Sequence, residues 1–92
     1  MRQHKGLLKQ VVHGSELGMI SSLQLPLIEI MGNKRILIEN HCGVSEYGTN
    51  EICVRVKKGY VVISGQQLML VQMSKEQIVI CGCVDGIRLI ER

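Results

Sequence analysis

The fold class is decided by the stretch Ile52-Cys53-Val54-Arg55-Val56-Lys57. β-Branched aliphatic side chains at every second position alternate there with cysteine, arginine and lysine. An extended chain places successive side chains on opposite faces, so this pattern predicts a strand with one buried face and one face in water. It is the clearest strand pattern in the chain, and it favours an all-β protein.

On both sides of this strand, the chain is rich in β-branched residues and is interrupted by glycine at short intervals, which is typical of successive strands and turns. Gly32-Asn33 suits a tight hairpin turn because both residues tolerate positive φ. Short connections require neighbouring strands to run antiparallel. With residues 52–57, we expect at least seven strands, the others being residues 27–31, 35–39, 60–64, 68–73, 77–81 and 87–90.

Residues 61–63 and 78–81 are apolar at consecutive positions, so neither face of these strands suits water. The sheet must therefore be covered by itself, by the N-terminal residues or by another subunit. A spacing of 16, 17 and 17 residues separates Gly32, Gly48, Gly65 and Gly82, which suggests one hairpin per repeat. We predict a single small antiparallel sheet domain of seven to eight short strands, arranged as a meander, a roll or a sandwich.

The 92 residues suffice for one domain, which we place at residues 23–92. Residues 1–22 read as an N-terminal arm, and Leu7, Leu8, Val11 and Val12 are spaced for one face of a short helix. Neither an apolar run of 18 residues nor a signal-peptide pattern is present. We therefore expect a cytoplasmic protein without a membrane span, whose cysteines remain thiols.

Hydrophobic residues make up 46% of the chain, but Phe and Trp are absent and there are two tyrosines, so the core must be aliphatic. The same shortage removes the aromatic platforms on which single-stranded nucleic acids stack. The formal net charge of +3 is also small for a protein that neutralises many phosphates. We expect no nucleic-acid partner.

The four cysteines do not have the spacing of a structural zinc site. Cys81-Gly82-Cys83 is the only close pair, and Cys42 and Cys53 form no matching knuckle. Buried, unreactive thiols are the favoured interpretation, so we predict no metal ligand and no cofactor. The alternative is a metal- or redox-responsive regulator that uses Cys42, Cys81 and Cys83 with His41.

Enzyme chemistry has two weak candidates. His41 and Cys42 are adjacent, and adjacent side chains on an extended chain face opposite ways, which excludes a simple nucleophile and base pair. A turn at Gly43 would bring Glu39 and Glu46 side by side as an acid and base pair, but no oxyanion donor or phosphate loop accompanies them. We expect no enzymatic activity.

A polar hairpin at residues 40–47 is the first place to look for a binding site. The candidate interaction or turn residues are Asn40, His41, Gly43, Glu46 and Tyr47, with Gly32 and Asn33 nearby. Asparagine and glycine also satisfy the backbone of an ordinary turn. A well-bonded hairpin and a partner-binding tip therefore remain alternatives.

Two motifs carry a family resemblance: L-P-x-I-x-x-x-G-N at residues 25–33, and I-E-N-H-x-G-[IV]-x-E-Y at residues 38–47. Together with GYVVISG at residues 59–65, they resemble the YqfC-type members of the YabP/YqfC sporulation family, over residues 23–90. The chain departs from the expected pattern at Cys42, Cys81 and Cys83, which argues against a family-wide role for thiols.

The resemblance implies a small all-β protein that contributes to endospore formation in the mother cell and has no catalytic residue. We therefore expect a non-enzymatic binding or scaffolding protein. Its expected partner is another protein, with a sporulation membrane protein and a second copy of the chain as the alternatives. The expected location is the mother-cell cytoplasm, with the outer surface of the forespore membrane as a peripheral site.

Overall fold

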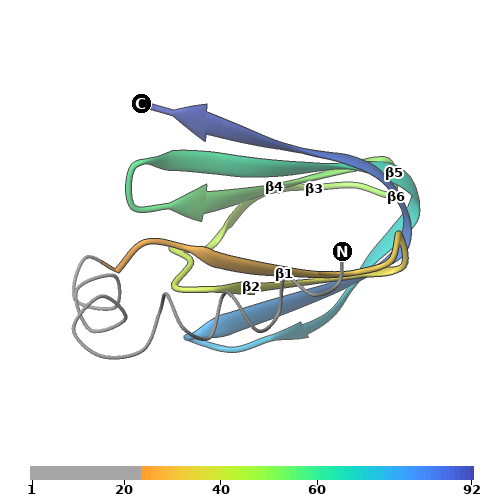
Figure 1. Ribbon diagram of the computed structural model, residues 1–92, viewed down its shortest axis with the longest axis horizontal. Helices are drawn as coiled ribbons and strands as arrows, with labels where there is room; N and C mark the ends of the chain where they lie inside the picture. Colours follow the sequence, from red (N-terminus) through yellow and green to blue (C-terminus); the bar gives the residue numbers. More distant parts are fainter. Residues whose placement is uncertain (1–23) are drawn as a thin grey trace, which may run out of the picture.

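The computed structural model describes residues 24–92, which form one six-stranded antiparallel sheet (Figure 1). Within these residues there is no helix, and the strand order is β1-β2-β6-β5-β4-β3. The predicted all-β antiparallel domain is confirmed, whereas the arm at residues 1–22 and its helix lie outside the described residues. The strands are β1 (Leu27–Met31), β2 (Arg35–Glu39), β3 (Val44–Tyr47), β4 (Glu51–Val56), β5 (Gly59–Met73) and β6 (Gln77–Glu91).

Two strands are much longer than predicted, because β5 and β6 each contain 15 residues. Gly65 and the Asp85-Gly86 pair were expected to separate strands, but each lies inside a continuous strand. Six strands therefore replace the predicted seven to eight. The glycine repeat does not mark hairpins throughout, since Gly65 and Gly82 lie within β5 and β6.

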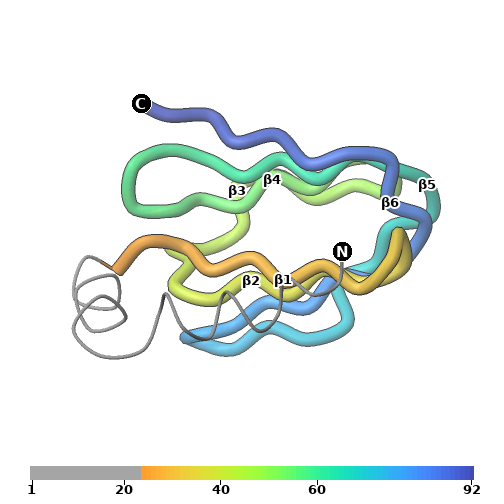
Figure 2. Tube along the Cα trace, in the orientation of Figure 1, coloured from red at the N-terminus to blue at the C-terminus, as the bar shows by residue number. Residues whose placement is uncertain are grey.

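The long pair β5–β6 bends sharply near its middle and folds the sheet back on itself (Figure 2). The register between the two strands shifts at Ser64/Gly65 and at Gln66/Met69, and Gln67 has a φ of 54°. Such bulges strengthen the local twist and allow a strand to turn a corner. The bend divides the sheet into two layers that face each other.

We call these the β1 layer and the β4 layer. The β1 layer contains β1, β2, residues 77–81 of β6 and residues 69–73 of β5. The β4 layer contains β3, β4, residues 59–64 of β5 and residues 86–91 of β6. The arrangement combines features of the predicted roll and sandwich, since one sheet supplies both layers.

The core fills the space between the layers and is aliphatic, as the composition predicted. Alternate side chains of each central strand point inward, which follows from the two-residue period of a strand. Among the described residues, no polar or charged residue is buried. The core consists of Ile36, Ile38, Ile52, Val54, Val56, Val61, Ile63, Leu68, Ile78 and Ile80.

The predicted hairpin at residues 40–47 is wrong, because β2 and β3 do not pair. β2 pairs with β1 and β6, whereas β3 pairs with β4. Residues 40–43 instead carry the chain from the β1 layer to the β4 layer. The local sequence indicated a turn correctly, but the strand on each side of it finds its partners elsewhere.

Candidate functional site

Backbone and side-chain hydrogen bonds hold the crossover at residues 40–43 to both layers. The Gly43 N–H donates to Nδ1 of His41 at 2.9 Å, and His41 Nε2 lies 2.8 Å from the Ser74 carbonyl oxygen. Since Nδ1 accepts a hydrogen bond, the proton of the neutral ring is on Nε2, which donates to Ser74. His41 thus ties the crossover to the β5–β6 turn, which makes it a structural link.

Replacing His41 with alanine is expected to lower the free energy of unfolding by roughly 1–3 kcal/mol, because the hydrogen bond to Ser74 is lost and the Gly43 N–H loses its acceptor. Chemical denaturation of the purified full-length chain measures the change. Cys42→Ala is the control, since Cys42 is the adjacent residue and is exposed. Equal stability of the two variants would remove the linking role of His41.

Asn40 fixes a different segment to the crossover. It has a φ of 63°, and its Nδ2 donates to the Leu25 carbonyl oxygen at 3.0 Å. Its backbone N–H donates to the Glu76 carbonyl oxygen at 3.1 Å. Asparagine tolerates this left-handed conformation better than most residues do. Asn40 therefore holds the segment that leads into β1.

The remaining predicted residues of the motif lie apart from His41. Tyr47, on β3, receives a hydrogen bond on its hydroxyl from the Leu70 N–H at 3.3 Å. Glu46 is exposed on the same strand and lies opposite Cys53. Glu39 pairs instead with Gln77 on β6. The structure does not bring Glu39 and Glu46 together as neighbouring residues of paired strands.

Gly32 and Asn33 lie at the opposite end of β2 from Asn40, so the predicted residues do not form one cluster. Gly32 has a φ of 57°, and the Lys34 N–H donates to the Met31 carbonyl oxygen at 3.2 Å. Three residues separate the paired Met31 and Arg35, which agrees with the predicted strand ends. The Asn33 carbonyl oxygen accepts from the Val84 N–H at 2.8 Å, which fastens the turn to β6.

The four cysteines are free thiols spread over the fold. Cys42 lies in the crossover, Cys53 on β4, and Cys81 and Cys83 on either side of the bend in β6. No group of three or more His, Cys, Asp or Glu side chains among residues 24–92 could hold a metal ion. In this part of the chain, the geometry offers no support for the alternative of a metal-responsive regulator.

The outer surface of the β1 layer carries apolar side chains that local sequence motifs did not reveal. Residues opposite each other on paired strands share a face, so Leu37 and Val79 lie together, as do Cys81 and Met69. Their neighbours in the sequence point into the core, which places these side chains outside. We call the set the outer apolar face: Leu27, Met31, Leu37, Met69 and Val79.

Val79 has 2% of its surface exposed although it lies outside the core, whereas Met31 and Met69 are 60% and 56% exposed. A shallow hollow of about 210 Å³ is lined there by Glu29, Met31, Arg35 and Leu37. Residues 78–81, which are apolar at successive positions, were the available sequence signal. That signal indicated a covered sheet but did not identify the face.

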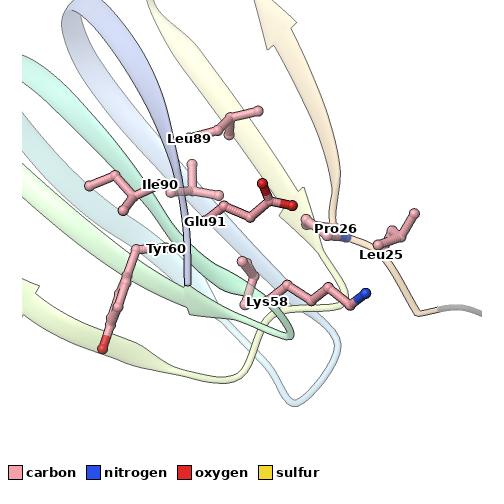
Figure 3. A pocket seen from close by; sticks show the side chains of 9 residues that line it. Leu25, Pro26, Lys58, Tyr60, Leu89, Ile90 and Glu91 are labelled. Atoms are coloured by element: carbon pink, nitrogen blue, oxygen red, sulfur yellow. The ribbon is translucent and has the colours of Figure 1, made fainter.

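A second surface is an apolar groove of about 360 Å³ between the start of β1 and the end of β6 (Figure 3). Figure 3 shows Pro26, from the segment before β1, across from Leu89 and Glu91 of β6. Sequence reasoning missed this groove because its two sides are about 60 residues apart in the chain. The lining residues are Leu25, Pro26, Val56, Lys58, Tyr60, Val61, Leu89, Ile90 and Glu91.

In the described part of the chain, no helix is long and apolar enough to cross a membrane. Comparison with known proteins identifies sequences similar to this chain. The chain is 33% identical over 69 residues to the uncharacterized protein YqfC of Bacillus subtilis (strain 168), an alignment that covers 75% of this chain and 74% of that protein. No solved structure matches. The sequence profile of the YabP family matches residues 24–92, which include all six strands, and the chain therefore belongs to the YabP family.

Proposed function

We propose that this protein contributes to endospore formation as a non-enzymatic binding or scaffolding protein in the mother cell. Its partner in this proposal is another protein, which docks on the outer apolar face. Membership in the YabP family supports the sporulation part of the proposal. The location, in the cytoplasm and at the forespore membrane, belongs to the same proposal.

The exposure of Met31 and Met69 on the outer surface of the β1 layer is the observation that carries the binding role. Contiguous exposed apolar patches are uncommon on soluble monomers and often mark interaction sites. Methionine is flexible and polarizable, so it adapts to the shape of a partner. Charged residues border the apolar ones on this face, since Glu29 lies opposite Leu37 and Arg35 lies opposite Met31.

Met69→Glu is expected to weaken partner binding by at least about tenfold, because a carboxylate buried in an apolar interface loses its hydration. The measurement is recovery of mother-cell proteins with the tagged full-length chain, compared by mass spectrometry with the wild type. Thr49→Glu is the matched control, since it adds the same charge at an exposed residue in the loop between β3 and β4.

The same variants test the role in sporulation when they replace the wild-type gene in a spore-forming host. We expect gene deletion and Met69→Glu to reduce the count of heat-resistant spores, and Thr49→Glu to leave it unchanged. Normal sporulation in the deletion strain would contradict the sporulation role. Normal sporulation and partner recovery with Met69→Glu alone would contradict only the docking face.

A further inference from the structure

The last part of β6, residues 86–91, forms a free edge of the sheet. On one side these residues pair with residues 59–64 of β5. On the other side, no strand in the described part of the chain pairs with them, because the pairing of β2 with β6 ends at Cys81. The edge borders the apolar groove of Figure 3, which Leu89 and Glu91 line.

The backbone of this edge directs hydrogen-bonding groups away from the sheet. The Arg92 N–H donates to the Lys58 carbonyl oxygen at 2.8 Å, so Arg92 directs its backbone groups to the β5 side of β6. Successive residues of a strand direct these groups to alternate sides. Ile87, Leu89 and Glu91 therefore direct theirs to the free edge.

At the centre of this edge, Leu89 exposes an apolar side chain. It lies opposite the core residue Val61, yet 68% of its surface is exposed. Proteins commonly protect free edges with proline, lysine or a bulge. Residues 86–91 contain neither proline nor lysine, and their pairing with β5 has no register shift within it. The edge is therefore suited to pairing with another strand.

We propose that a second copy of this chain pairs with this edge, so that residues 86–91 of the two copies run antiparallel about a two-fold axis at Leu89. A two-fold axis brings the same surface of both copies together, as in most homodimers. In this register Leu89 faces Leu89 of the second copy, and Ile87 of each copy faces Glu91 of the other. These three facing pairs, each exchanging two bonds, give about six backbone hydrogen bonds.

The charges along the edge favour this register over its neighbours. A register centred on Arg88 would place the two arginines opposite each other, and one centred on Ile90 would place Arg88 opposite Arg92 of the other copy. Like charges directly opposite each other destabilise a sheet. With Leu89 at the axis, Arg88 faces Ile90, no like charges are opposed, and the two exposed leucines cover each other.

The edge of β1, across the groove, is less suited to such a pairing. Pro26 precedes this strand, and Glu29 lies at its centre. A two-fold axis at the centre of β1 would place the two Glu29 carboxylates opposite each other. The proposed dimer is also independent of partner binding on the outer apolar face, because Leu89 belongs to the β4 layer and Met69 to the β1 layer.

Sedimentation equilibrium of the purified full-length chain tests the proposal. We expect a reversible dimer with a dissociation constant below about 100 μM. Leu89→Glu is expected to raise this constant at least about tenfold, because it places two carboxylates opposite each other at the axis. Met69→Glu is the matched control, since Met69 is a similarly exposed apolar residue of the other layer, and we expect it to leave the constant unchanged. A monomeric wild-type chain, or a dimer that Met69→Glu dissociates as strongly as Leu89→Glu does, would overturn the proposal.

Amide hydrogen exchange of the wild-type chain, measured by NMR at several protein concentrations, tests the register. We expect the amides of Ile87, Leu89 and Glu91 to exchange at least about tenfold more slowly in the dimer than in the dilute monomer. The amides of Arg88 and Ile90, which are directed to β5, are expected to change by less than about twofold. Slow exchange at the first three amides that does not depend on concentration would mean that the same chain covers the edge. That result, or fast exchange at every concentration, would contradict the dimer.

Discussion

Gly82→Ala is expected to lower the free energy of unfolding by about 3 kcal/mol or more, because the bend in β6 has no room for a methyl group. A Cβ atom at this position would lie 2.6 Å from the Gln67 carbonyl oxygen and 2.9 Å from the Leu68 Cα. Both neighbours are backbone atoms of the adjoining strand, so neither can move independently of the sheet. Gly82 also has a φ of 141°, which alanine rarely adopts. Urea denaturation followed by circular dichroism measures the loss.

Gly86→Ala is the matched control, since Gly86 lies four residues later in the same strand. A Cβ atom there meets no described atom within 4 Å, and its φ is outside the left-handed range. We expect its effect to stay within about 1 kcal/mol. If Gly82→Ala were as stable as Gly86→Ala, the close approach of β5 and β6 at the bend would be incorrect.

Ile80→Ala is expected to cost about 2–5 kcal/mol, the second largest effect, because Ile80 is fully buried between the layers. It lies opposite Ile36 on β2 and Leu70 on β5, so truncation leaves a cavity where three strands meet. A core without aromatic rings has few large side chains that could move to fill the space. The change is measured as the shift of the urea denaturation midpoint. The shift reports stability when the m value, the slope of the unfolding free energy against urea concentration, is the same for both proteins.

Met31→Ala provides the comparison for this prediction. Met31 is a similarly large apolar residue in the same layer, but 60% of its surface is exposed. Its truncation removes little buried area in the isolated protein, and we expect a change below about 1 kcal/mol. A loss with Met31→Ala as large as that with Ile80→Ala would mean that the outer apolar face is covered within the isolated protein.

Some strand bounds followed correctly from local sequence, and others did not. Residues 27–31 and 35–39 were predicted with the observed ends, because alternating side chains and a Gly-Asn turn are signals contained within a few residues. Gly65 and Gly86 gave the same signal inside continuous strands. A glycine allows a turn, a bulge or a close backbone approach, and the choice depends on the strand beside it.

At the candidate site, too, local sequence predicted some features, while others depended on distant residues. Asn40 and Gly43 were recognised as residues that suit an irregular backbone, and both have that role. His41, which was predicted as a candidate interaction or turn residue, has it as well. Their partners Leu25 and Ser74 could not be predicted, because they are 15 and 33 residues away along the chain. The expected pairing of residues on either side of Gly43 failed for the same reason.

By itself, the sequence determined the all-β class, the aliphatic core and the polar character of the segment at residues 40–43, since these depend on composition and on the two-residue period of a strand. Only the tertiary structure decided that β5 and β6 bend, that β2 and β3 separate, and that the outer apolar face and the groove form. These features depend on contacts between distant strands. Local pattern shows which side chains avoid water, whereas strand pairing decides which of them remain exposed.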